Sequence, residues 1–200
     1  MMKRIITVIL VCLTVCISAL AEPGKKGGGM GGHGGSMDVL NEGIAYLNGD
    51  GVEQDYEHAL QIFQSAAETG NKKAARYIGL MYEQGLGVKQ DYETAASYYA
   101  QGVDSGDLTS YYYLGLLYKQ GLGVEQDYGK AAELFSSVAV SDNKSATGVV
   151  AAGFELGQLY ELGMGVEQDV EKAAELYTEA AGYGNEDAVA ALERLNITEN

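Results

Sequence analysis

The chain has 200 residues with 28 acidic and 13 basic side chains, a formal net charge of −15 at pH 7, two cysteines and two histidines. A surface this acidic repels nucleic acid and anionic membranes, so neither is expected as a partner. So few cysteines and histidines leave no set of residues for a nucleophile with its base or for a thiolate metal site.

Residues 1–21 have the pattern of a secretory signal peptide. Lys3 and Arg4 precede an apolar run that ends at Leu20, and small residues stand just before Glu22. An uncleaved membrane anchor is the alternative, since this run could nearly span a bilayer. The small-residue ending favours cleavage. We therefore expect an exported protein, periplasmic in a bacterium or otherwise secreted, with no membrane insertion after cleavage.

The mature chain is expected to begin with a glycine-rich tether at residues 22–36. Both cysteines, Cys12 and Cys16, lie in the signal segment, so the mature chain has none, and its 11 basic and 28 acidic side chains give a net charge of −17. Solubility explains such a charge, and a partner with a basic surface is the sharper alternative. His33 in the tether falls far short of a metal site, and no cofactor or metal is expected.

A loop phrase appears four times in the remaining residues, 37–200. It reads Gly-Leu-Gly-Val-Glu-Gln-Asp-Tyr at residues 121–128, and close variants start 72 and 36 residues before it and 42 residues after it. A repeat of this length indicates a solenoid, in which each unit buries its apolar face against its neighbours. The expected units cover residues 39–74, 75–110, 111–152 and 153–188, followed by a capping helix to residue 195.

Each unit is expected to be a helix, a glycine loop and an antiparallel helix. In the second unit, the apolar residues from Ala74 to Gln84 fall on one helical face, and Gly85 follows where a left-handed residue ends a helix. Asp91 can cap the second helix, which is expected to run to Asp104. Large rings should pack on small residues, because this lets the paired helices approach closely. Rings recur at Phe63, Tyr99, Phe135 and Tyr177, and glycines at Gly43, Gly79, Gly115 and Gly157.

Residues 114–132, with the sequence LGLLYKQGLGVEQDYGKAA, resemble the Sel-1-like repeat, a relative of the tetratricopeptide class with a longer glycine loop. The resemblance covers about Val39 to Leu195. It implies an all-α solenoid that is not an enzyme and that acts as an adaptor or scaffold by binding another protein on its concave face. The isolated protein is expected to be a monomer.

Two other functions stay open as alternatives. Some members of the resembled family are immunity proteins, which implies a periplasmic protein that neutralises a secreted toxin. A hydrolase is the third reading, because carboxylates are abundant. These carboxylates recur at the same positions of each unit, which argues against a hydrolase. A residue that every unit contains is explained by a structural role in that unit.

The third unit departs from the pattern between Ser141 and Val150, where six extra residues stand and the usual closing glycine is lacking. Such an insertion bulges from one face of a solenoid and often belongs to the binding face. Neutral drift of a loop explains it equally well.

Binding is expected at positions that differ between units and project from the first helices, which line the concave face in related solenoids. Three consecutive tyrosines at residues 111–113 cannot all face one core, so at least one ring is expected to be exposed; the alternative is that the extra rings pack between units. Tyrosine and arginine are common in binding hot spots. The predicted partner-binding residues are Arg76, Tyr77, Glu83, Tyr112, Tyr113, Lys119, Phe154, Glu155 and Glu161.

Overall fold

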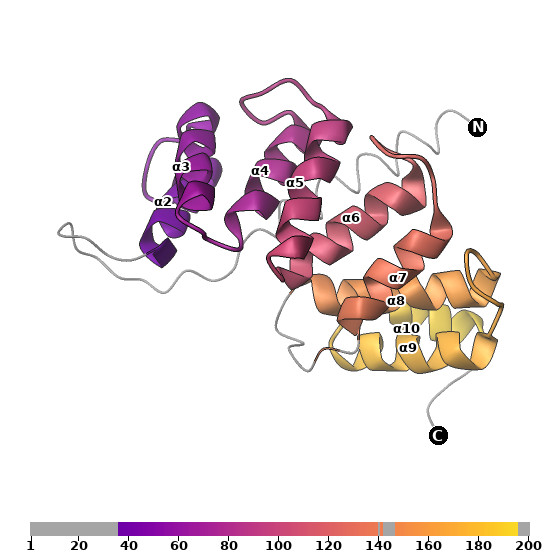
Figure 1. The fold of residues 1–200 in the computed structure, drawn as a ribbon. Coiled ribbons are helices and arrows are strands. Elements are labelled where there is room, and N and C mark those ends of the chain that lie inside the picture. The colour runs from indigo at the N-terminus through magenta and orange to yellow at the C-terminus, as the bar shows by residue number, and fades with distance from the viewer. Residues whose placement is uncertain (1–35, 140, 142–146, 196–200) are drawn as a thin grey trace, which may run out of the picture. The chain divides into compact units, whose positions relative to one another are not determined.

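The computed structural model describes residues 36–139, 141 and 147–195 (Figure 1). The expected signal peptide and nearly all of the tether lie outside the described residues, as does most of the insertion. Every regular element in the described part is an α-helix. In chain order the helices are α2 (Ser36–Asn48), α3 (Tyr56–Glu68), α4 (Ala74–Gln84), α5 (Tyr92–Asp104), α6 (Leu108–Gln120), α7 (Tyr128–Ala139), α8 (Thr147–Leu162), α9 (Val170–Gly182) and α10 (Glu186–Arg194).

The helices pack as four successive pairs: α2 with α3, α4 with α5, α6 with α7, and α8 with α9. The second helix of each pair also packs on the first helix of the next pair, and α9 packs on α10 in the same way. Each unit therefore buries its apolar face between its neighbours, and the predicted all-α solenoid is confirmed.

The ends of the helices follow from the loop phrase. Helix α4 ends at Gly85, whose backbone has φ 71° and whose amide donates to the Met81 carbonyl. Helix α5 begins after Asp91, whose carboxylate accepts bonds from the amides of Glu93 and Thr94. The Asp91 amide in turn donates to the Tyr82 carbonyl at 2.9 Å, which draws the start of the second helix back to the end of the first.

The recurring glycines of the first helices sit against the recurring rings of the second helices. A Cβ atom built on Gly79 would lie 2.7 Å from the Tyr99 ring, which is closer than real Cβ contacts come. The other three glycine–ring pairs are as tight. The ring fills the space that a side chain would need, as the sequence predicts.

The loop glycines tie each unit to the one before it. A Cβ atom on Gly123 would overlap the backbone of Tyr92, and one on Gly165 would overlap the backbone of Tyr128. Gly51, in the loop of the first unit, would meet nothing within 4 Å. The close approach therefore belongs to the contact between units and not to the loop itself.

Within the described residues, no helix combines the length and the hydropathy needed to cross a membrane.

Candidate functional site

Two of the predicted binding residues, Tyr77 and Tyr113, lie inside the solenoid. Their side chains are 3% and 6% exposed. Tyr77 stacks on Phe63 with ring centroids 4.9 Å apart, and Tyr113 stacks on Tyr99 at 5.2 Å. Each ring thus packs on the second helix of the preceding unit. For the three consecutive tyrosines at residues 111–113, two alternatives were an exposed ring and packing between units. Tyr113 packs between units.

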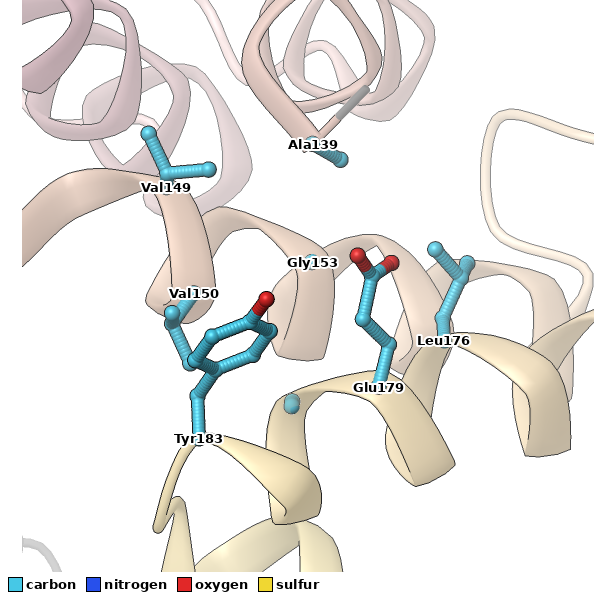
Figure 2. Close-up of a pocket in the computed structure, with 8 residues that line it drawn as sticks. Ala139, Val149, Val150, Gly153, Leu176, Glu179 and Tyr183 are labelled. Atoms are coloured by element: carbon cyan, nitrogen blue, oxygen red, sulfur yellow. The ribbon is translucent and has the colours of Figure 1, made fainter. Parts of the chain in front are cut away.

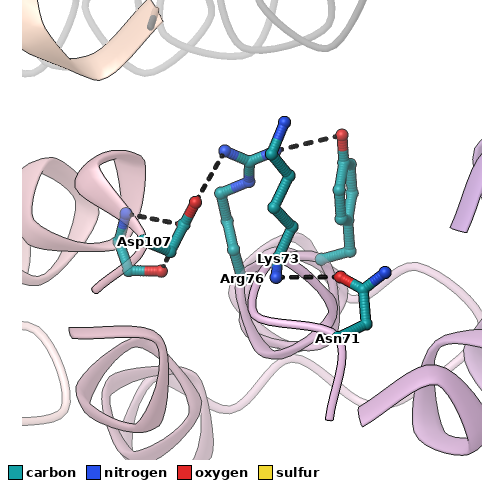
Figure 3. Close-up of polar contacts among 6 residues, drawn as sticks. Asn71, Lys73, Arg76 and Asp107 are labelled. Atoms are coloured by element: carbon teal, nitrogen blue, oxygen red, sulfur yellow. Dashed lines mark hydrogen bonds and ion pairs between the residues drawn. The ribbon is translucent and has the colours of Figure 1, made fainter. Parts of the chain in front are cut away.

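Arg76 is buried at the start of α4 and links two units (Figure 3). Its guanidinium donates to the Asp107 carboxylate at 3.4 Å and to the Tyr77 hydroxyl at 3.2 Å. Asp107 caps α6 and also accepts bonds from the amide and the hydroxyl of Ser110. A buried arginine with these partners holds α4 and α6 in register, because an unpaired charge here would carry a large desolvation penalty.

Glu83 and Glu161 occupy the same position in the second and fourth units, and each accepts a bond from a tyrosine hydroxyl of its own unit. The donors are Tyr99 for Glu83 and Tyr177 for Glu161. The first and third units carry phenylalanine in place of this tyrosine, and Leu47 or Lys119 in place of the glutamate. A glutamate therefore stands at this position only in the units whose ring is a tyrosine. Aligning the four units shows this pairing, but our prediction missed it.

The two glutamates have opposite electrostatic environments. Burial raises the pKa of Glu83, although the bond from Tyr99 acts in the other direction. Bonds from the Arg194 guanidinium of α10 lower the pKa of Glu161, and burial opposes this shift. Burial and the bond to Glu161 raise the pKa of Tyr177. Glu161 is thus a charged link to the last helix, whereas Glu83 is a carboxylate whose charge is poorly solvated.

Lys119 joins the third unit to the fourth. Its ammonium group donates to the Glu155 carboxylate and, at 2.8 Å, to the Gln158 side chain, so α6 and α8 are bonded directly. The side chains of Lys119 and Glu155 remain 22% and 15% exposed. Both residues can therefore touch a partner while they hold the two units together.

Tyr112 and Phe154 are the two predicted aromatic residues that stay half-buried. Tyr112 tilts against Tyr113 and Phe135, and Phe154 tilts against Tyr177 at 5.5 Å. Each ring rests on the core and keeps part of its surface toward solvent. The predicted residues that reach the surface are Glu83, Tyr112, Lys119, Phe154 and Glu155, which we call the first-helix face.

A second feature, which sequence reasoning missed, lies where α7 ends, α8 begins and α9 passes beneath them (Figure 2). An apolar crevice opens there, and Glu179 and Tyr183 stand side by side at its mouth. We call it the α9 crevice. The residues that line it are Ala139, Val149, Val150, Gly153, Leu176, Glu179, Ala180 and Tyr183.

The crevice could have been predicted from positions at which the fourth unit differs from the other units. Tyr183 stands where the other units have Thr69, Ser105 and Ser141, and Gly153 stands where they have Ala75 and Tyr111. The predicted binding residues came from the first helices, and the insertion from Ser141 to Val150 was the other surface considered. Its residues Val149 and Val150 line the crevice, but Tyr183, which follows a second helix, was passed over.

A row of carboxylates runs along α9 from the crevice. Glu171, Glu175 and Glu179 follow one another at intervals of four residues and are all exposed. With Ala174 and Thr178 they border a broad, shallow depression of the surface. Glu179 belongs to both features, so the row and the crevice form one continuous surface.

Across the parts of the chain that the structure describes, no three or more histidine, cysteine, aspartate or glutamate side chains are grouped so that they could hold a metal ion. His58 packs edge-on against the Tyr46 ring, with centroids 4.4 Å apart.

Comparison with protein families identifies the repeats. The Sel1 repeat family matches residues 43–71, 72–107, 109–139 and 150–182, which together make up more than half of the chain. The four segments agree with the four helix pairs. A comparison with curated proteins gave no match.

Solved structures include two similar proteins from bacteria. One is a protective antigen of uropathogenic Escherichia coli strains with an SLR fold, 30% identical with a TM-score of 0.67. The other is a Sel1 repeat protein from Oxalobacter formigenes, 32% identical with a TM-score of 0.69. Each similarity covers 78% of this chain, but only 32% of the first protein and 62% of the second. The chain thus spans less than two thirds of either relative.

Proposed function

The chain belongs to the Sel1 repeat family, and we propose that it is an exported, non-enzymatic adaptor or scaffold that holds a partner protein on its first-helix face. Sel1 repeat proteins are protein-interaction modules. One observation carries the proposal for this face. Residues that recur in every unit include those used for packing and capping, whereas the five residues of the first-helix face stand at positions where the residue type differs between units.

The composition of the first-helix face suits protein recognition. Tyr112 and Phe154 offer aromatic surface that is already fixed by the core, so little conformational freedom is lost on binding. Glu83, Lys119 and Glu155 add ionisable side chains to this face, and Lys119 and Glu155 are paired with each other. Aromatic and polar side chains occur together at protein interfaces.

The signal-peptide pattern of residues 1–21 supports export, with the periplasm as the compartment in a bacterium. The net charge of −15 supports a partner with a basic surface, since opposite charges speed encounter and exclude wrong partners. The same charge favours a second candidate function, that of an immunity protein against a basic toxin. Survival of toxin-exposed cells only when the chain is expressed would distinguish this function from a scaffold.

The experiment that tests the proposal is quantitative capture of partners from an envelope extract. The bait is the chain from residue 22 onward, compared with a variant that carries Glu83→Gln and Lys119→Gln. Glutamine at position 83 can still accept the Tyr99 bond, and the melting temperature of the variant checks that loss of the Lys119 ion pair leaves the fold intact. We expect the dominant captured protein to fall at least tenfold with the variant.

A matched control carries Glu53→Gln and Lys72→Gln. These exposed residues lie in a loop and before α4, and their replacement changes the charge in the same way. Because both variants leave the net charge unchanged, equal losses would show that the effect is not specific to the first-helix face. That result, or a captured protein that survives the first-helix variant, would contradict the proposed surface.

A further inference from the structure

We propose that Glu83, with the Tyr99 hydroxyl bonded to it, is the binding site for one arginine side chain of the partner protein. The guanidinium would lie on the Glu83 carboxylate as the Arg194 guanidinium lies on Glu161 in the fourth unit. The inference rests on the proposed function, because it names the chemistry that the first-helix face receives. It also adds a site that can be tested without the partner.

Glu83 occupies a position from which first helices reach the next helix of the array. At this position of the third unit, Lys119 donates to Gln158 of α8 at 2.8 Å. At the same position of the fourth unit, Glu161 accepts bonds from Arg194 of α10. In both units the helix that follows therefore supplies a polar or charged group that matches the residue at this position.

The helix that follows Glu83 supplies no such group. The repeat aligns Gln158 of α8 with Leu116 of α6, and counting from the capping residues of α6 and α10 aligns Arg194 with Leu116 as well. Leu116 is apolar and half-buried. A carboxylate thus stands opposite a leucine at the one junction where neither an arginine nor a glutamine is present.

The Glu83 carboxylate has one bonded oxygen and one open oxygen. Its Oε2 accepts a bond from the Tyr99 hydroxyl. Among the described residues, no ion pair reaches Glu83 and no donor reaches its Oε1. Every buried side-chain oxygen or nitrogen in the described part of the chain has a hydrogen-bond partner, so this unpaired Oε1 lies at the surface. The open oxygen is therefore accessible to a ligand.

The fourth unit shows that the tyrosine bond and an arginine can share one carboxylate. Tyr177 donates to Oε2 of Glu161 at 2.8 Å, as Tyr99 does to Oε2 of Glu83. The Arg194 guanidinium nevertheless donates to both oxygens of Glu161, at 2.8 Å to Oε2. Such a paired contact suits the planar fork of arginine, whereas lysine acts as a single point charge.

The fold has no need of a charge at this position. The first unit carries Leu47 there, 3% exposed, and the solenoid forms around it. Burial raises the pKa of Glu83, and no cation opposes that shift. The carboxylate is thus unfavourable in the isolated chain, since a buried charge without a counter-charge is poorly stabilised. Local departures of this kind are expected at functional sites.

The arginine is expected to come from another protein. Within the described residues the chain has two arginines, Arg76 and Arg194, and each is already paired with a carboxylate. Neither is therefore available to a second copy of the chain without the loss of its own ion pair. A partner with an exposed arginine meets no such penalty.

The first experiment supplies the arginine within the chain from residue 22 onward, which contains the whole compact unit that the helices form. Leu116→Arg places a guanidinium where α10 has Arg194, and Leu116→Gln is the control for lost apolar packing. We expect Leu116→Arg to melt about 2–4 °C above Leu116→Gln. The difference should vanish when Glu83→Gln is added to both. Equal melting temperatures with Glu83 present would contradict the site.

The second experiment offers the cation from outside. Butylguanidinium and butylammonium are titrated while the NMR signals of Glu83 and Tyr99 are followed. We expect butylguanidinium to bind at least about threefold more tightly, because it bonds both carboxylate oxygens. Leu116→Arg and Glu83→Gln should each abolish the response. Unchanged signals in the parent chain would overturn the site, and equal binding of the two probes would overturn its assignment to arginine.

The fourth unit provides the matched control for these titrations. Glu161 is already occupied, so its signal should not respond to butylguanidinium in the parent chain. Arg194→Ala removes the resident guanidinium, and this side chain is 59% exposed, so its loss opens no cavity in the core. Glu161 should then bind butylguanidinium as Glu83 does. An equal response of Glu161 with and without Arg194 would contradict the comparison on which the proposal is built.

The last experiment connects the site with the partner. Capture from the envelope extract is repeated with Leu116→Arg and Leu116→Gln as baits. We expect the dominant captured protein to fall at least about tenfold with Leu116→Arg alone, because its own arginine occupies Glu83. A concentration-dependent shift of the Glu83 signal without any probe, together with a dimer mass in solution, would replace the partner with a second copy.

The outcomes separate this inference from the proposed function. If Glu83→Gln with Lys119→Gln loses the partner and Leu116→Arg keeps it, the first-helix face stands and the arginine site is wrong. If neither variant loses the partner, both proposals are wrong.

Discussion

The junction between the second and third units and the junction between the third and fourth units share one contact and differ in another. In both, a loop glycine presses on the backbone of a tyrosine in the preceding unit, Gly123 on Tyr92 and Gly165 on Tyr128. At the first junction the helix ends meet through a buried ion pair between Arg76 and Asp107. At the second junction they meet through apolar residues that leave the α9 crevice.

The comparison separates contacts that both junctions share from contacts that differ between them. The loop glycine contact is present at both junctions, so we infer that it is required to stack one unit on the next. The polar lock is absent from the junction between the third and fourth units, and the fold persists there without it.

The largest expected effect breaks the shared contact. Gly123→Ala places a Cβ atom in the backbone of Tyr92 and a non-glycine residue at φ 68°. We expect it to lower the free energy of unfolding by about 3–5 kcal/mol, because left-handed strain and overpacking add. Urea denaturation followed by circular dichroism measures the loss, and Gly165→Ala should match it.

Gly51→Ala is the control for this prediction. Its φ of 77° is equally unfavourable for alanine, but its Cβ atom would meet no neighbour. We expect a loss of only about 1–2 kcal/mol, due to backbone strain alone. Equal losses for Gly51→Ala and Gly123→Ala would show that the loop glycines are kept for backbone conformation and not for contact between units.

The second prediction removes the polar lock. Asp107→Ala leaves the buried Arg76 guanidinium without its carboxylate and α6 without its cap. We expect a loss of about 3 kcal/mol in the free energy of unfolding. Asp127→Ala removes another capping aspartate, whose side chain is 39% exposed, and should cost about 1 kcal/mol. A smaller loss for Asp107→Ala than for Asp127→Ala would contradict the lock.

The third prediction compares glycines of the two junctions with each other. Gly102 of α5 faces Ser110, and its Cβ atom would overlap that side chain, so Gly102→Ala should cost about 1–3 kcal/mol. Gly153→Ala should instead add about 0.5–1 kcal/mol. Changes of opposite sign in the free energy of unfolding would confirm that Gly102 has no room for a Cβ atom and that Gly153 has room for one.

The smallest effects concern the two like glutamates, and they depend on pH. The pKa of Glu161 is lowered by Arg194, so its contribution to stability is present above the unfolded pKa of about 4.3 and is lost as pH falls through the folded value. Glu161→Gln should therefore destabilise the protein at pH 7 and have little effect at pH 3.

Glu83 should behave in the opposite way. Its pKa is raised by burial, so the folded state loses stability as pH rises from the unfolded pKa through the folded one. Glu83→Gln should stabilise the protein at pH 7 and be neutral at pH 3. Denaturation curves of the two variants at both pH values test the signs, and equal signs at pH 7 would refute the assigned environments.

The sequence contains enough to predict most of the fold. The spacing of the loop phrase predicts the units, and Gly85 and Asp91 predict where α4 ends and α5 begins, because capping depends only on nearby residues. The capping helix expected to end at residue 195 is observed as Glu186–Arg194. These features are local or are repeated four times, so one sequence shows them directly.

Less of the candidate site could be predicted, for a physical reason. The first helices carry Arg76, Tyr77 and Tyr113 at positions that differ between units, but variation alone does not tell whether a side chain faces solvent or a neighbouring unit. The partner of Arg76 lies 31 residues away on the next unit. The α9 crevice is likewise made by three helices, so its open floor at Gly153 emerges only from their packing.

The most direct test of the account is site-specific photo-crosslinking in living cells. A photoreactive phenylalanine analogue replaces, one at a time, Phe154 of the first-helix face and Tyr82, a half-buried ring that recurs in every unit. We predict a covalent adduct with another protein at Phe154 and none at Tyr82. Adducts of equal yield at both positions, or an adduct at Tyr82 alone, would contradict the claim that residues departing from the repeat form the binding surface.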